Sequence, residues 1–216
     1  MEKIIGYLCE KYNPNTLILY GSYGDGSNNK NSDFDALLIT DGIYPAHDSN
    51  VVDGILLDVF IYHTSLFCKE HCEDCVSALR GNLDFEDFVQ IFDGSIVVDS
   101  LGIGKKLKDA VLKYIENCPP KTAGENEIQV KWCEKMLLRV QREDAEGFYR
   151  WHWLLMDSLE IYCDICGIRY LGPKKSLIRM KKEDIDAYSI YEKALTYFEY
   201  KYLEQWISLL RNRLGN

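Results

Sequence analysis

The sequence predicts an α+β protein, in which a strand-rich N-terminal domain is followed by an all-helical bundle domain. Short runs of apolar residues, separated by glycine-rich or polar segments, lie in the first third of the chain and are typical of strands. The clearest runs are 17–20, 36–39 and 54–62. The second half instead repeats its apolar residues at helical spacing over long stretches. We therefore expect domains at 1–105 and 106–216, with linker-like residues at 117–126.

The N-terminal elements can be placed in order. A helix is expected from Glu2 to about Tyr12, because Ile4, Ile5 and Leu8 recur on one side of it. Asn13-Pro14-Asn15 ends this helix and starts a buried strand at Leu17. At Gly21-Ser22 that strand turns sharply into a glycine-rich segment and a short helix.

Three aspartates stand out in the next two predicted strands. Asp33 and Asp35 open the second strand with one residue between them, so their side chains point to the same face. Asp58 lies in the middle of the third apolar run, where an acid is costly unless it is paired or binds a metal ion. Like charges held this close need a cation between them, and Mg²⁺ prefers such oxygen ligands. The alternative is a hairpin with aspartates as turn formers, which leaves Asp58 unexplained.

The remaining segments are assigned by the same signals. Residues 41–50 read as a polar connection, 65–79 and 85–92 as helices, 94–100 as a strand, and 103–115 as an amphipathic helix. The helix expected at 65–79 carries Cys68, His71, Cys72 and Cys75, for which the alternatives are zinc binding and buried or half-buried thiols. In the second half, helices are expected at 128–142, at 143–166 and, as one long terminal helix, at 185–213. Gly172-Pro173 begins a basic connector between the helices expected at 143–166 and 185–213.

Composition limits the function classes. The formal net charge of -9 argues against a nucleic-acid-binding surface, which requires clustered Lys and Arg. The N-terminus lacks a signal-peptide pattern, and no apolar run approaches the length that spans a bilayer. Eight cysteines without a secretion signal indicate a reducing compartment. We expect a cytoplasmic protein with no membrane partner.

Gly21-Ser22, Asp33-Phe34-Asp35 and Asp58 together resemble the nucleotidyltransferase (polymerase-β-like) superfamily. In size and layout the chain is similar to small bacterial aminoglycoside and lincosamide nucleotidyltransferases and to minimal nucleotidyltransferases. The resemblance covers about the first half of the chain. It implies a mixed sheet flanked by helices, and a reaction that depends on two Mg²⁺ ions. Asp33 and Asp35 would hold both ions, and Asp58 would bind the one that contacts the attacking oxygen.

The resemblance also implies a nucleotide site. Ser22 and the backbone N–H groups of the Gly21 turn would grip the phosphates of ATP or another nucleoside triphosphate. Family members commonly carry a basic residue where this chain has Asp25, and Lys30 could replace that contact from the loop. The implied reaction transfers a nucleoside monophosphate to a hydroxyl and releases pyrophosphate.

The helical half is expected to supply the acceptor site. In the antibiotic-modifying relatives a carboxylate of the helical domain is the general base, and here Asp157 and Glu160 are candidates without a motif to align them. The alternative is that both face solvent on an amphipathic helix. Tyr149, Trp151 and Trp153 are expected to pack in the core, with stacking on a sugar or base as the alternative.

Three function classes follow from these residues. The first is an antibiotic-resistance-like enzyme that modifies a small hydroxylated molecule such as an aminoglycoside-like compound. The second nucleotidylates a protein partner, as an antitoxin would. The third is a non-catalytic nucleotide-binding protein of the same fold. This class stays an alternative because Asp25 stands where family members commonly carry a basic residue. The aromatic-rich bundle would also permit a homodimer.

Overall fold

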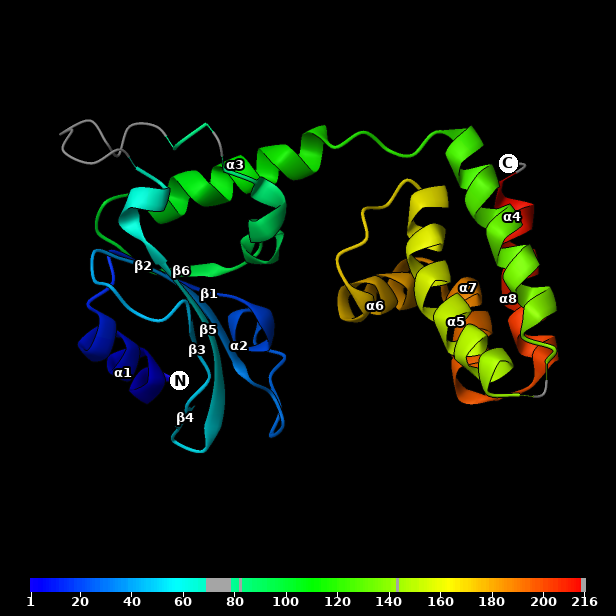
Figure 1. Ribbon diagram of the computed structural model, residues 1–216, viewed down its shortest axis with the longest axis horizontal. Helices are drawn as coiled ribbons and strands as arrows, with labels where there is room; N and C mark the ends of the chain where they lie inside the picture. The colour runs from blue at the N-terminus through cyan, green and yellow to red at the C-terminus, as the bar shows by residue number, and fades with distance from the viewer. Residues whose placement is uncertain (69–78, 82, 143, 215–216) are drawn as a thin grey trace. The chain divides into compact units, whose positions relative to one another are not determined.

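The computed structural model describes residues 1–68, 79–81, 83–142 and 144–214. The chain divides into two compact units, Met1–Cys118 and Pro119–Asn216 (Figure 1). Within the described residues the first unit contains a sheet with helices and the second contains helices alone, so the predicted α+β class is confirmed. The predicted domain division at residue 105 falls inside a helix of the first unit, α3 (Ile103–Asn117).

Within the described ranges, six strands form the sheet of the first unit. They are β1 (Thr16–Leu19), β2 (Phe34–Thr40), β3 (His47–Asp48), β4 (Val51–Val52), β5 (Ile55–His63) and β6 (Ser95–Asp99). Their order is β3-β5-β2-β1-β6, and β4 pairs with β5. The β2–β5 pair is parallel and the other pairs are antiparallel, so the sheet is mixed.

Helices cover both faces of this sheet (Figure 1). The helical segments of the unit are α1 (Glu2–Tyr12), α2 (Gly21–Asp25), α3, and the short 3₁₀ helices η1 (Thr64–Leu66) and η2 (Phe85–Ile91). Because side chains alternate along a strand, Leu17 and Leu19 pack with α1, whereas Ile18 packs on the opposite face with α3 and η2. Two apolar layers therefore sandwich β1 and β2, whose residues are almost all buried.

Asp99 ties α3 to the sheet. Its carboxylate accepts hydrogen bonds from the Thr16 hydroxyl in β1 (2.9 Å) and from the backbone N–H groups of Gly104 (2.8 Å) and Lys105 (3.0 Å). A carboxylate at the start of a helix satisfies N–H groups that have no partner within the helix. This contact fixes where α3 leaves the sheet and crosses its face.

The second unit is built from helices that bury a shared core. They are α4 (Ala123–Arg139), α5 (Ala145–Ile165), α6 (Pro173–Glu183), α7 (Ile185–Thr196) and α8 (Tyr200–Arg213). Trp206 of α8 is fully buried in this core, and its indole N–H donates to the hydroxyl of Ser158 at 2.8 Å. The buried Tyr191 hydroxyl donates to the carbonyl of Leu155 at 2.6 Å. The polar atoms of these large aromatics therefore have partners inside the bundle.

Several sequence predictions for secondary structure were wrong in detail. The single terminal helix predicted for 185–213 is two helices, α7 and α8, because the chain is extended at Tyr197 and the Phe198 ring packs 4.4 Å from that of Trp151. The basic connector after Gly172 is the start of α6, since Pro173 occupies the first helical turn, where a proline is favourable. The polar connection at 41–50 contains β3, which pairs with the edge of β5.

The predicted helix at 65–79 lies mostly outside the described residues. The candidate zinc ligands His71, Cys72 and Cys75, which accompany Cys68 in the sequence, also lie outside the described residues. Cys163 is buried in the bundle of the second unit, and this burial raises the pKa of its thiol.

Candidate functional site

The three predicted carboxylates lie together at one end of the parallel strand pair. Asp35 is in β2, Asp58 is in β5, and Asp33 directly precedes β2. One carboxylate oxygen from each lies within 4.8 Å of the others. Asp33 is exposed, whereas Asp35 and Asp58 are half-buried. The structure thus brings together all three acids that the sequence singled out.

Strand register places two of these acids side by side. Asp35 and Asp58 are direct partners in the parallel ladder of β2 and β5, so their side chains leave the same face of the sheet. Further along the same face, Leu37 and Tyr62 pack with the apolar layer under α3. The carboxylates therefore stand where this layer ends, within reach of solvent.

Gly21 lets the turn after β1 approach this cluster. Its backbone has φ +63, a conformation that residues with a side chain rarely adopt. A Cβ atom built on Gly21 would lie 2.7 Å from the carboxylate carbon of Asp35 and closer still to its Oδ2. Glycine is thus required here for both backbone conformation and space, and the Gly21-Ser22 turn lies directly against a predicted metal ligand.

The other residues predicted to bind the nucleotide lie after this turn. Ser22 is half-buried in the first turn of α2, and Lys30 is exposed in the loop before β2. Asp25 accepts hydrogen bonds from the backbone N–H of Ser27 (2.8 Å) and from its hydroxyl. Asp25 therefore stabilises the turn that ends α2.

The electrostatic field of the acids reaches a buried tyrosine. Tyr20 follows β1, and its backbone N–H donates to the carbonyl of Asp35 at 3.2 Å. Burial, and then the negative charges of Asp35 and Asp58, raise the pKa of the Tyr20 hydroxyl. Tyr20 accordingly stays protonated beside the carboxylates.

Sequence reasoning missed His47, which contacts the cluster directly. Its Nε2 lies 2.6 Å from Oδ1 of Asp58. The sequence offered little signal, because His47 lies in a polar stretch and β3 is too short to show alternation. Only the pairing of β3 with β5 brings this imidazole to the site.

Asp157 and Glu160 of α5 line a groove in the helical unit. The groove has a volume of about 360 Å³ and is also lined by Gln129 and Trp132 of α4. Asp157 is half-buried and accepts a hydrogen bond from the indole N–H of Trp153 at 2.6 Å, whereas Glu160 is exposed. Both carboxylates thus face a shared concave surface within one unit.

The expectation of core packing for the aromatic residues of α5 holds only for Trp151, which is buried. Tyr149 and Trp153 are exposed at 69% and 39%, and the Trp153 ring lies 5.5 Å from that of Trp132 beside the groove. An aromatic wall therefore accompanies the two acids.

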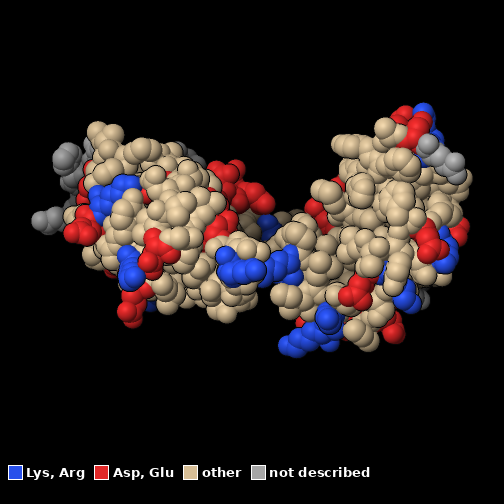
Figure 2. Space-filling view, turned by 90° about the horizontal axis from the view of Figure 1, so that it is seen from below, with Lys and Arg blue, Asp and Glu red and all other residues tan. Residues whose placement is uncertain are grey.

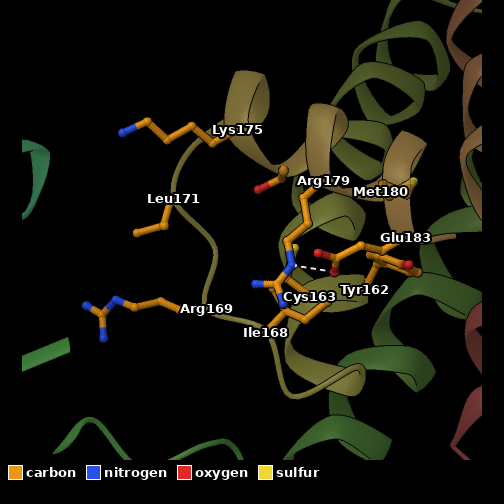
Figure 3. A pocket seen from close by; sticks show the side chains of 10 residues that line it. Tyr162, Cys163, Ile168, Arg169, Leu171, Lys175, Arg179, Met180 and Glu183 are labelled. Atoms are coloured by element: carbon orange, nitrogen blue, oxygen red, sulfur yellow. Dashed lines mark hydrogen bonds and ion pairs between the residues drawn. The ribbon is translucent and has the colours of Figure 1, made fainter. Parts of the chain in front are cut away.

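A second pocket of the helical unit lies between α5 and α6. Figure 3 shows Tyr162 and Cys163 against α6, where Arg179 pairs with Glu183 at 2.7 Å. This pocket encloses about 60 Å³, whereas ligand pockets occupy roughly 300 Å³ or more. It holds none of the predicted site residues, and its size excludes a nucleotide.

The surface shows mixed charge. On the face drawn in Figure 2, Lys and Arg lie in small groups among Asp and Glu in each unit. None of the helices in the described ranges combines the length and the hydropathy needed to cross a bilayer.

One comparison with known protein families supports a nucleotidyltransferase domain in the N-terminal unit. Residues 1–79 match the family model described as a nucleotidyltransferase domain. A crystal structure of a nucleotidyltransferase-like protein from Exiguobacterium sibiricum aligns over 99% of this chain and 74% of that one, at 16% identity and a TM-score of 0.40. No curated protein sequence matches the chain significantly. The matched region includes Gly21, Ser22 and all three aspartates. Residues 1–79 belong to the nucleotidyltransferase superfamily.

Proposed function

We propose that the protein transfers a nucleoside monophosphate, AMP from ATP, to a hydroxyl of a small molecule such as an aminoglycoside-like compound, and releases pyrophosphate. The observation that carries the proposal is the convergence of Asp33, Asp35 and Asp58 beside the Gly21-Ser22 turn of a nucleotidyltransferase domain. Nucleotidyl transfer needs cations and hydrogen-bond donors for the negatively charged phosphates. The three carboxylates would hold the cations, and the turn would supply the donors.

The donor set fits divalent metal ions. Three carboxylates with oxygens within 4.8 Å repel one another unless a cation lies among them, and Mg²⁺ takes oxygen ligands. In this proposal Asp33 and Asp35 would hold two Mg²⁺ ions, and Asp58 would help to hold one of them. Bound Mg²⁺ would lower the pKa of the attacking hydroxyl and offset the charge of the triphosphate.

The turn after β1 is proposed to hold the phosphates. Backbone N–H groups at the start of α2 and the Ser22 hydroxyl are hydrogen-bond donors beside the carboxylates. Lys30 adds a positive charge from the loop between α2 and β2. These groups would align the triphosphate for in-line attack, and alignment provides much of the acceleration in phosphoryl transfer.

The groove between α4 and α5 is the proposed acceptor site. Trp153 and Trp132 offer aromatic faces for a sugar ring, and the Oε1 atom of Gln129, which lines the groove, has no hydrogen-bond partner among the described residues. Glu160 or Asp157 would accept the proton of the acceptor hydroxyl. Acidic side chains would also favour an acceptor with protonated amines.

One observation favours a second candidate, a non-catalytic nucleotide-binding protein. Asp25 accepts hydrogen bonds from Ser27 and adds negative charge near the proposed phosphate site. That charge would weaken triphosphate binding unless Lys30 offsets it. Such a protein would bind ATP with Mg²⁺ but leave it intact.

The proposal is tested by incubating the full chain with Mg²⁺, ATP labelled at the α-phosphate and a library of hydroxylated small molecules that includes aminoglycosides. We expect label on a small molecule and one pyrophosphate per transfer, both abolished by chelation of the metal and by Asp35→Asn. Label on protein from an added cell extract would support a protein-modifying enzyme instead. Binding of ATP without any transfer would support the non-catalytic candidate.

A further inference from the structure

The imidazole of His47 contacts the Asp58 carboxylate directly. His47 Nε2 lies 2.6 Å from Asp58 Oδ1, and the two side chains are 40% and 39% exposed. An ionised carboxylate can only accept hydrogen bonds, so Nε2 of His47 is the donor. The contact joins the edge strand β3 to the strand that carries Asp58.

The imidazole is held in place by its own strand. His47 is the register partner of Phe60 across the β3–β5 ladder, and the two rings lie 4.9 Å apart. The two antiparallel partners project from the same face of the sheet, which is also the face of Asp58. Asp58 lies two residues before Phe60 on this face, so the contact between the two rings orients His47 toward Asp58.

The next residue anchors β3 on the opposite face. Asp48 is buried and accepts hydrogen bonds from the Tyr12 hydroxyl (2.5 Å), the Lys11 ammonium (3.0 Å) and both the side-chain (2.6 Å) and backbone (3.0 Å) nitrogens of Asn50. Such a network around a buried carboxylate resists movement of the backbone that carries it. A two-residue edge strand would otherwise be held only by its few ladder hydrogen bonds.

We infer that His47 is a positioning residue, which holds the Asp58 carboxylate in the orientation that binds a divalent ion. Its hydrogen bond occupies Oδ1 of Asp58, so that Oδ2 would remain for an ion held together with Asp33 and Asp35. Hydrogen bonds that orient a ligating carboxylate commonly change metal affinity by about 10- to 100-fold. This inference rests on the proposed function, because it assumes that Asp58 binds the ion.

Two substitutions separate the hydrogen bond from the ring. His47→Phe keeps an aromatic ring against Phe60 but has no N–H group to donate. His47→Gln loses the ring but can place an amide N–H near the position of Nε2. His63→Asn is the matched control, because His63 lies at the other end of β5, where it contacts Ser65 and the carbonyl of Asp41.

The measurement is Mn²⁺ binding to the full chain in the presence of α,β-methylene ATP, followed by the increase in water-proton relaxation rate as the ion joins the protein. We expect His47→Phe to weaken Mn²⁺ binding by about 10- to 100-fold, His47→Gln to stay within about 3-fold of the original chain, and His63→Asn to have no effect. Circular dichroism and thermal unfolding would establish that each variant is folded.

Three results would overturn the inference. Unchanged Mn²⁺ binding by His47→Phe would show that the donor is not needed. Equal losses in His47→Phe and His47→Gln would show that His47 acts through packing or structure. No Mn²⁺ binding by the original chain would overturn the proposed metal site and, with it, the role of His47. Failure of the metal site is thus distinguishable from failure of the His47 role alone, in which the original chain still binds Mn²⁺.

Discussion

Asp35 and Asp58 are register partners on adjacent parallel strands, and their carboxylates point to the same face of the sheet. Each of the two carboxylates offers an oxygen within 4.8 Å of the other, so their like charges repel each other. Asp33 adds a third charge to the same point. A cluster of this kind is costly to fold without a cation, which is why we connect it with metal-dependent chemistry.

Asp58→Asn should reduce nucleotidyl transfer by about a thousand-fold, because a neutral amide is a weaker metal ligand and several kcal/mol of transition-state stabilisation would be lost. Steady-state pyrophosphate release measures this. Asp53→Asn is the control, since Asp53 lies in the turn before β5 and pairs on the surface with Lys3. Equal rates for the two variants would argue against a role for Asp58.

Gly21→Ala should abolish transfer, because its Cβ would push the Asp35 carboxylate out of place. Gly26→Ala separates this effect from backbone strain. Gly26 also has a positive φ, +75, but a Cβ there would meet no atom within 4 Å. Both variants should lose about 1–2 kcal/mol of stability from the left-handed backbone, and only Gly21→Ala should lose activity. Comparable activity of the two variants would contradict the close contact between residue 21 and the Asp35 carboxylate.

Asp48→Asn should destabilise the chain by about 2 kcal/mol at pH 7. Burial raises the pKa of this carboxyl, but hydrogen bonds from Tyr12, Asn50 and Lys11 outweigh it and lower the pKa from 3.8 to about 2. The folded state thus binds a proton less readily than the unfolded state, and the stabilisation is complete above about pH 4 and lost as the pH falls toward 2.

Urea unfolding at pH 7, 5 and 3 tests this prediction. The difference between the original chain and Asp48→Asn should be constant at the two higher pH values and smaller at pH 3. Asp53→Asn removes an exposed ion pair and should change stability by less than about 1 kcal/mol at every pH. A difference that stays constant down to pH 3 would contradict the lowered pKa of Asp48.

Glu160→Gln and Asp157→Asn should impair use of the acceptor and leave the KM for ATP unchanged, because both residues line the groove of the helical unit. We expect a loss of about 10²- to 10⁴-fold in kcat/KM for the acceptor from whichever residue is the general base. Glu192→Gln, an exposed change in α7 that does not line the groove, is the control. Full acceptor turnover by both groove variants would remove this groove from the proposal.

The sequence predicted the acids of the site because their signal is local. Asp33 and Asp35 are two residues apart at the start of a strand, and Asp58 is a single acid in an apolar run, so period-two alternation and the cost of burial identify them. The helices with strong apolar periodicity, such as α1 and α3, were predicted for the same reason.

What could not be predicted depends on contacts between distant segments. The register that pairs Asp35 with Asp58, and the pairing that brings His47 to Asp58, are set by strand alignment and leave no local pattern. The break between α7 and α8 arises where Phe198 packs on Trp151, a tertiary contact that overrides helical periodicity. The start of α6 was not predicted, because the basic residues after Gly172-Pro173 indicated a connector, although a proline is favourable in a first helical turn.

The most direct test of the central claim is calorimetric titration of ATP into the full chain with and without Mg²⁺, compared with the Asp33→Ala and Asp35→Ala variants. We predict that ATP binds with Mg²⁺, that binding is lost without the metal, and that either substitution weakens it by at least about 10-fold. ATP binding that is independent of Mg²⁺ and unchanged in both variants would contradict a metal-centred nucleotide site at Asp33, Asp35 and Asp58.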